Sequence, residues 1–583
     1  MSVDVLTRLA GPRRRVSAFQ GASFTLIAAV GVMVGYPFLK VVVSLFIVDG
    51  APSFEPIRRA FASDGIGEVL KTSVIVVFAA GILAVIIGSL MAWLNERTDA
   101  RIPGVTDFVP LMPFLLPGIA FAIGWVLLLS PGAGILNVWI RDFLGLFGVE
   151  ATRGPLNIYT MYGLIFCYFN ALVPYAFLFV SAGLRNMPAD LEEQARVAGA
   201  GRFKTFWRVT LPAMRPSVSA AAVMLIWFGF AMFSIPFIIG TGGNIEVLTV
   251  RIVRLINFTY PPQTDLAVSL SLFILLFVGG AWLIQLRIMK SATFVQIGGR
   301  GARGTTVRLG WGKWPARALM IGFLLVSGVL PMVGLLLTAL QGFWSQRIDL
   351  GNLGFDSFKR VWQDEHVIDS FRNSLVLAAI TATGIIVFAA LMSTYMRRHG
   401  GVVSRILEGA IRLPVVVSGF VLIIGMILAY SGAPFYLQGS FLLFVIAYMA
   451  MTIPQASIIA DAAAAQVSDS MSEAAAVSGA KEGKIFRKIL VPLMIPGLVA
   501  GWTLVFVHVA GDMEVAAMLA SNEKPVVGYA ILQTFNAGKF ADLAAIAVTL
   551  VLVSAACIGL GNLAGYFLSG HAGLRKSKKA KKA

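Results

Sequence analysis

Long apolar stretches alternate with short polar segments along most of this chain. Six stretches of the length that crosses a bilayer, roughly 20 residues, lie in the first half, and six more lie in the second. Their approximate bounds are 19–48, 72–94, 108–129, 158–184, 217–240, 266–286, 316–341, 373–396, 411–430, 440–460, 497–520 and 543–568. The pattern predicts an all-α integral membrane protein with about 12 transmembrane helices.

Composition and charge support this prediction and orient the chain. Hydrophobic residues make up 58% of the sequence and charged residues only 13%, which excludes an ordinary soluble protein. Most of the 47 lysines and arginines fall in segments on one side, so both termini are predicted to be cytoplasmic. The net charge of +18 comes from these segments and from a basic tail suited to anionic lipid. No nucleic-acid-binding module is present, so we expect the lipid bilayer as a partner and no nucleic acid.

The two halves of the chain are duplicates. The loop at 193–216 recurs at 473–496, an offset of 280, with 10 of 24 positions identical. Upstream the offset is 301, as in the pairs Ser73/Ser374 and Gly124/Gly425, and the 21-residue difference fits a longer outer loop around 130–159. Repeats of six spans have the same topology, which predicts two parallel six-helix domains. We assign residues 1–286 to the first domain, 287–315 to a basic cytoplasmic linker, and 316–583 to the second.

Each repeated loop, 190–212 and 470–492, has the sequence of a helix-turn-helix on the cytoplasmic surface. Asp190 and Ser470 each precede a glutamate by three residues, which predicts a capping box at the start of a helix. A glycine six residues after each glutamate ends that helix, and a proline is expected to restart the chain into the next span. The alternative is a hairpin that only anchors its span in the membrane surface.

The second loop resembles the EAA motif of the inner-membrane permease subunits of bacterial binding-protein-dependent ABC importers. That motif reads Glu-Ala-Ala, three residues, Gly, and then a hydrophobic-Pro pair; the first loop is similar but has Gln194 in place of the first alanine. The resemblance implies two fused type I importer permease domains whose loops are coupling helices, each seated in a cleft of an ATP-hydrolysing subunit. The residues expected to carry this coupling are Glu193, Ala195, Gly199, Phe206, Pro212, Glu473, Ala474, Ala475, Gly479, Phe486 and Pro492.

The same resemblance implies the partners and the location. No GxxxxGK[ST] loop occurs in the sequence, so ATP and Mg are expected on a separate ATPase, a pair of identical subunits, and this chain is expected to be no enzyme and to hold no cofactor. A periplasmic binding protein would deliver the cargo to a permease in the bacterial inner membrane. The segments beginning at Phe233 and Gly511 resemble permeases of the ferric-iron importer group, which also includes thiamine and phosphonate systems. Ferric ion is the expected cargo, with thiamine, phosphonate or polyamine as alternatives.

Two other classes of protein remain open. Twelve spans in two parallel halves also suit a secondary transporter driven by an ion gradient, although the repeated loops would then have no role. A membrane enzyme would need a polar site, and His508, Asp512 and Glu514 in the eleventh predicted span are the candidates. These three residues either pack the halves together or line the substrate path, and the first half has Phe228, Met232 and Ser234 at the equivalent positions. No metal ligands are assigned.

Overall fold

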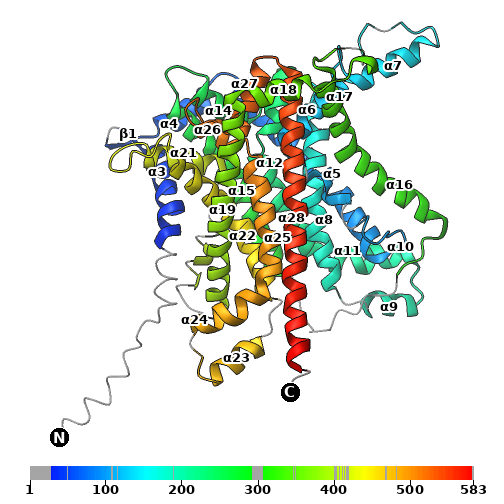
Figure 1. The fold of residues 1–583 in the computed structure, drawn as a ribbon, viewed down its shortest axis with the longest axis vertical. Helices are drawn as coiled ribbons and strands as arrows, with labels where there is room; N and C mark the ends of the chain where they lie inside the picture. The colour runs from blue at the N-terminus through cyan, green and yellow to red at the C-terminus, as the bar shows by residue number, and fades with distance from the viewer. Residues whose placement is uncertain are drawn as a thin grey trace.

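The computed structural model of this chain describes residues 28–48, 50–106, 109–114, 116–150, 152–187, 190–291, 306–345, 347, 349–398, 404–405, 407–409, 411, 414, 419–465, 469–480 and 482–580. These residues form a bundle of long helices, in agreement with the predicted all-α class (Figure 1). Two short strands, β1 (Ile47–Val48) and β2 (Ala51–Pro52), form an antiparallel pair in which Ile47 lies opposite Pro52.

The first half contains short helices at both ends of the bundle and long helices through it. Its helical elements are η1 (Gly31–Gly35), α3 (Tyr36–Phe46), α4 (Glu55–Ala62), α5 (Ile66–Arg97), η2 (Val109–Phe114), α6 (Gly118–Leu129), α7 (Ile135–Gly145), α8 (Met161–Asn186), α9 (Asp190–Val197), α10 (Arg202–Thr205), η3 (Phe206–Thr210), α11 (Leu211–Ala213), α12 (Arg215–Ala231), η4 (Pro236–Gly240), α13 (Thr241–Gly243), α14 (Leu248–Asn257) and α15 (Thr264–Ser291).

The second half repeats this order of long and short helices. Its elements are η5 (Gly310–Gly312), α16 (Lys313–Leu324), η6 (Leu325–Val329), α17 (Leu330–Gln341), η7 (Leu350–Asn352), α18 (Asp356–Gln363), α19 (Glu365–Arg398), α21 (Gly419–Tyr430), α22 (Phe441–Ala465), α23 (Asp469–Val477), α24 (Glu482–Ile485), η8 (Phe486–Leu490), α25 (Val491–Ala510), α26 (Glu514–Leu519), α27 (Val527–Asn536) and α28 (Phe540–Ala580).

Not every predicted span is a full-length helix. In the described part of the chain, nine helices are long and apolar enough to cross a membrane, and a tenth results if a pair bent by 59° between η3–α11 and α12 counts as one span. Among the described residues, the longest helices in the predicted spans 108–129 and 411–430 are the 12-residue α6 and α21. Before α6, Pro110, Pro113 and Pro117 remove backbone donors, and the chain there forms a short 3₁₀ helix.

Two predicted spans also end earlier than expected. The stretch 217–240 is broken after Ala231, and the stretch 497–520 is broken after Ala510. In each case the chain turns and then forms a shorter helix, η4 or α26. The apolar run in the sequence continues through both breaks, so hydrophobicity alone did not reveal them.

The first span of each half packs against the other half. Helix α3 lies along α21, and α17 lies along α6 (Figure 1). A methyl group on Gly425 would lie 2.6 Å from the carbonyl oxygen of Pro37, and one on Gly124 would lie 2.5 Å from that of Pro331. The two halves therefore approach each other backbone to backbone at two equivalent glycines.

The duplication is visible in matching polar contacts as well. The hydroxyl oxygen of Ser73 accepts a hydrogen bond from the Leu248 amide at 2.8 Å, where α14 begins. The hydroxyl oxygen of Ser374 accepts one from the Val527 amide at 2.8 Å, where α27 begins. Ser73 and Ser374 are a pair at the 301 offset, so the structure confirms that the repeats extend beyond the loops.

The predicted insertion in the first half is helix α7, between α6 and α8. Asn137 at its base is fully buried. Its amide nitrogen donates to the carbonyl oxygens of Leu129, Ser130 and Leu156, and its amide oxygen accepts from the Leu156 amide at 3.0 Å. One buried side chain thus closes the insertion, and α7 projects beyond the bundle (Figure 1).

The second half begins on the surface of the first. Val307 forms an isolated parallel bridge with Thr98, and the Asp99 carboxylate accepts a hydrogen bond from the Leu309 amide at 2.8 Å. Arg317 in α16 donates to the carbonyl oxygens of Asp99 and Ala100. These contacts fix the start of α16 beside the end of α5.

A test of the reciprocal packing is to replace Gly124 or Gly425 by leucine. Each leucine would meet backbone atoms of the opposite half that cannot move aside, so we expect destabilisation by about 1–3 kcal/mol or more. Thermal unfolding of the purified chain in detergent measures the effect. Gly279→Leu is the matched control, because a side chain there meets nothing within 4 Å. Equal midpoints for all three variants would contradict the packing argument.

Candidate functional site

The first repeated loop lies at one end of the bundle and consists of two short helices joined by a glycine turn. Helix α9 ends where Gly199 adopts a φ of +80°, and the Ala200 amide donates to the Ala195 carbonyl oxygen at 2.9 Å. Such a left-handed residue at a helix end favours glycine, as the sequence predicted. The chain then continues through α10 and η3 toward α12.

The second loop has the same backbone. Helix α23 ends where Gly479 adopts a φ of +78°, and the Ala480 amide donates to the Ala475 carbonyl oxygen at 3.1 Å. Helices α24 and η8 follow, as α10 and η3 do in the first loop. Both loops lie at the end of the bundle where α28 terminates (Figure 1). The predicted capping by Asp190 and Ser470 concerns side chains outside the described residues.

The two prolines occupy first-turn positions, as predicted, but neither begins a separate helix. Pro212 and Pro492 each lie at the second position of a helical segment that continues directly from a five-residue π-helix, η3 or η8. In each π-helix the last amide bonds to the carbonyl five residues earlier, from Leu211 to Phe206 and from Val491 to Phe486. The wider π turn accommodates a proline that would clash in an ordinary α-helix.

The predicted coupling residues divide into exposed and packed groups. Glu193, Gly199, Glu473, Ala474 and Gly479 are exposed, whereas Ala195 and Ala475 are partly covered. Phe206 does not point outward: its ring packs against Trp93 of α5 with centroids 5.3 Å apart. Phe486 packs on a cluster of buried apolar side chains in its own half. The two phenylalanines therefore position the loops, and α9, α23 and the glycine turns after them present the accessible surface.

An apolar pair in each loop was missed by the sequence analysis. Val197 and Val477 are both 89% exposed, just before the glycine turns. Leu191 and Met471 are 42% and 40% exposed at the start of the same helices. These residues are related by the 280 offset, and the shared valine was visible in the alignment of the loops. Matching exposed apolar residues on two loops are typical of surfaces that a partner covers.

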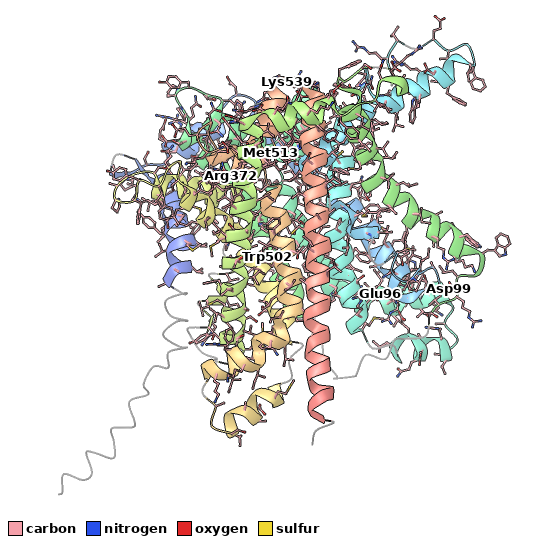
Figure 2. All side chains as sticks on the ribbon, viewed as in Figure 1. Glu96, Asp99, Arg372, Trp502, Met513 and Lys539 are labelled. Carbon is pink, nitrogen blue, oxygen red and sulfur yellow. The ribbon has the colours of Figure 1, made fainter. Side chains whose placement is uncertain are left out.

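The first loop is held by a buried ion pair. Arg97 at the end of α5 and Glu192 in α9 are 7% and 5% exposed in their side chains, with Nε and Oε2 3.7 Å apart. Glu192 also accepts a hydrogen bond from the Thr210 hydroxyl at 2.7 Å, and Arg97 donates to the Leu184 carbonyl oxygen at 2.8 Å. Figure 2 shows neighbouring Glu96 and Asp99 beside the first loop. The ion pair and these two hydrogen bonds, which we call the latch, join α5, α8, α9 and η3.

The second loop is held by apolar contacts instead. Leu490 occupies the position of Thr210 and is buried, as are Ile485 and Met494 beside it. They pack against Ala390 of α19 and against the C-terminal turn of α22. The duplicated loops thus share a backbone but differ in the interaction that anchors them.

The polar residues near position 512 lie at the break after α25, far from the loops, as the label on Met513 in Figure 2 shows. The sequence placed His508, Asp512 and Glu514 in one predicted span, but the helix ends at Ala510, so His508 and Asp512 do not lie on one face of it. His508 is exposed, whereas Asp512 is buried and accepts a hydrogen bond from the Val515 amide at 2.8 Å. Asp512 therefore precedes α26 and satisfies the Val515 amide in its first turn.

Glu514 lies between the two halves. Its carboxylate reaches the backbone of Phe233 in the first half and lies 3.8 Å from the position that a methyl group on Gly419 would take in the second half. Tyr448 of α22 faces Asp512. The sequence analysis missed this tyrosine because it is distant along the chain. In the described residues, no three or more His, Cys, Asp or Glu side chains are grouped so that they could hold a metal ion.

The fold and the paired loops define a membrane permease built from two equivalent halves. A family model described as "Binding-protein-dependent transport system inner membrane component" matches residues 84–289 and again residues 382–572. The chain belongs to this family. It is the membrane-spanning permease of an ABC importer, and both halves carry the family's domain.

Several proteins are similar over long stretches. The chain is 22% identical over 541 residues to the ferric transport system permease protein FbpB of Actinobacillus pleuropneumoniae, covering 92% of this chain and 77% of that protein. It is also 22% identical over 540 residues to the Fe(3+)-transport system permease protein FbpB 2 of Haemophilus influenzae, covering 91% and 95%. A solved bacterial alginate ABC transporter in complex with alginate pentasaccharide-bound periplasmic protein is 18% identical, covering 43% of this chain and 93% of that chain, with a TM-score of 0.36.

The buried ion pair between Arg97 and Glu192 predicts that Glu192 and its neighbour Glu193 contribute very differently to stability. Glu192→Gln leaves the Arg97 charge buried without a counter-ion, so we expect a loss of about 3 kcal/mol in stability. Glu193→Gln, at the exposed neighbouring position, is the control and should change stability by under about 1 kcal/mol. Thermal unfolding of both variants in detergent measures the two losses of stability. If the two midpoints fall equally, the latch does not anchor the loop.

The exposed valines predict a contact with a partner. Val197→Ser combined with Val477→Ser removes two apolar contacts and is expected to weaken capture of the ATPase subunit by roughly tenfold. The thermal midpoint of the isolated permease should not change, because both side chains are exposed. Val149→Ser, a half-exposed valine beyond the other end of the bundle, is the control. Undiminished capture by the double variant would show that these valines do not contact the ATPase.

Proposed function

We propose that this permease imports ferric ion. The observation that carries this proposal is a set of hard oxygen donors where the halves meet: Asp512 lies beside the Tyr448 hydroxyl, and the Glu514 carboxylate lies by Phe233 of the first half and Gly419 of the second. Carboxylate and phenol oxygens suit hard, highly charged cations better than soft ligands do. The two long relatives named for ferric transport support the same cargo.

His508, Asp512 and Glu514 would then belong to the substrate path. His508 is exposed just before the break, and Glu514 is partly accessible just after it. A broken helix is tolerated at membrane depth where its backbone lines a cavity, which favours a path role over simple packing. The equivalent residues in the first half, Phe228, Met232 and Ser234, carry no charge, so the charged wall would be one-sided.

The energy would come from a separate ATPase. Two identical ATP-binding subunits, which hold ATP and Mg, would each receive one loop, with Glu193 to Phe206 on one side and Glu473 to Phe486 on the other. Their closure would push the loops together and rotate the six-helix halves from inward-open to outward-open. A periplasmic binding protein would load the cargo at the opposite end. In this arrangement both termini are cytoplasmic, and residues 287–315 link domains 1–286 and 316–583.

Thiamine, phosphonate and polyamine remain alternative cargoes. The carboxylates near position 512 favour a cation and so disfavour phosphonate. A secondary transporter, the alternative from another class, would leave the matching exposed surfaces of α9 and α23 without a partner.

The proposal is tested by purifying the chain from native membranes in mild detergent. A co-purifying ATPase whose activity falls when Glu473 and Gly479 are replaced is expected. A chain that purifies alone and moves substrate in vesicles without ATP would overturn the ATP-driven mechanism. Metal analysis of vesicles loaded with ATP and binding protein then separates ferric ion from the other cargoes.

Iron uptake should depend on the carboxylate at the centre of the path. Glu514→Gln and His508→Ala are expected to lower uptake of radioactive ferric ion by about tenfold, because each removes a group that interacts with a charged cargo. Glu523→Gln, an exposed carboxylate in the following loop, is the control. Uptake that stays normal in both variants, at equal expression, would reject their role in the path.

A further inference from the structure

A cavity of about 500 Å³ lies at the end of the bundle opposite the coupling loops. Its polar lining comes from both halves of the chain. The first half contributes Arg251 and Arg254 of α14 together with Thr241, Thr259 and Gln263, and the second half contributes Asn536 at the end of α27. The volume is in the range of sites that hold small ligands.

The cavity carries a net positive charge. Glu246 pairs with both arginines, its Oε2 lying 3.3 Å from Arg251 Nη1 and its Oε1 lying 3.0 Å from Arg254 Nη1. One carboxylate therefore balances two guanidinium groups. The Arg254 side chain is 41% exposed and that of Arg251 is 29% exposed, so both reach the cavity without being fully solvated.

Hydrogen-bond donors remain available there. A guanidinium group has five N–H donors. In the described part of the chain, Arg254 uses Nη1 for Glu246, and Arg251 uses Nη1 for Glu246 and Nη2 for the Asp64 carbonyl oxygen. The buried Thr241 hydroxyl oxygen, also at the cavity, has no hydrogen-bond partner among these residues. The lining is thus rich in donors that an oxyanion accepts from.

In the part of the chain that the structure describes, the arginine pair occurs at this position in the first half and not in the second. Helices α14 and α27 begin with equivalent serine contacts. By this alignment of the repeats, Arg251 corresponds in position to Ala530, and Arg254 to Gln533. Asn257, the counterpart of Asn536, donates its side-chain amide to the Ala517 carbonyl oxygen. The equivalent place in the second half therefore lacks the arginines, and its asparagine is already bonded.

We propose that this cavity binds a small anion with carboxylate or phosphate groups, held by Arg251 and Arg254 and reached by Asn536 from the other half. The anion would join α14 to α27 across the boundary between the halves. Its source is either a free solute or the phosphate of a lipid headgroup, since both present the same oxygens. This site is independent of the cargo and of the coupling loops.

The experiment uses the full chain in neutral detergent, titrated with inorganic phosphate and with citrate by calorimetry. Saturable binding of at least one of them is expected. Arg251→Gln and Arg254→Gln should each weaken it by about tenfold or more, because each removes a charged donor. Glu246→Gln should tighten binding, since it removes the competing carboxylate. Arg372→Gln, which alters an arginine of α19 (Figure 2) paired with Asp369 outside the cavity, should have no effect.

A competition experiment distinguishes a free anion from the phosphate of a lipid headgroup. Phosphatidylglycerol added to the micelles should displace phosphate if a headgroup occupies the cavity, and phosphate binding that is unaffected by the lipid assigns the site to a free anion. Absence of saturable binding by phosphate, citrate and phosphatidylglycerol would overturn the proposal. So would affinities that are the same in the Arg251, Arg254 and Glu246 variants, because that result would mean general ionic screening.

Discussion

Close contact between backbones at two glycines holds the halves of this permease together. Lipid is as apolar as the helix surfaces, so spans associate through tight packing and not through the hydrophobic effect that drives soluble proteins together. Gly124 and Gly425 have no side chain to separate them from Pro331 and Pro37. The first span of each half is therefore joined to the opposite half, and any rotation of one bundle carries a span of the other with it.

The two repeated loops are presented alike but held differently. Both end their first helix at a left-handed glycine, and both expose a valine at the tip. Beneath this shared surface, the first loop depends on a buried ion pair between Arg97 and Glu192, whereas the second depends on apolar packing around Leu490. Breaking a buried ion pair leaves an uncompensated charge away from water, whereas the apolar contacts around Leu490 depend on close packing. The two loops are therefore attached to their halves by different forces.

Polar chemistry is also unequal between the halves, although the scaffold is duplicated. The breaks after Ala231 and Ala510 are equivalent in position, but only the second is followed by Asp512 and Glu514. In the same way, only α14 carries arginines at the outer cavity. Such differences are expected where one asymmetric ligand meets a pseudo-symmetric protein, because a single set of polar groups suffices to bind it.

The sequence by itself determined the all-α membrane class, the duplication, the insertion between α6 and α8, the glycine turns and the family, because each depends on local composition or on spacing along the chain. Hydrophobicity could not reveal the breaks after Ala231 and Ala510, since the apolar residues continue through them. The tertiary structure alone decided which residues come together: Arg97 with Glu192, Gly425 with Pro37, and Asn536 with the arginines of α14 around one cavity. These partners are far apart in the chain, and no local pattern encodes the packing that brings them together.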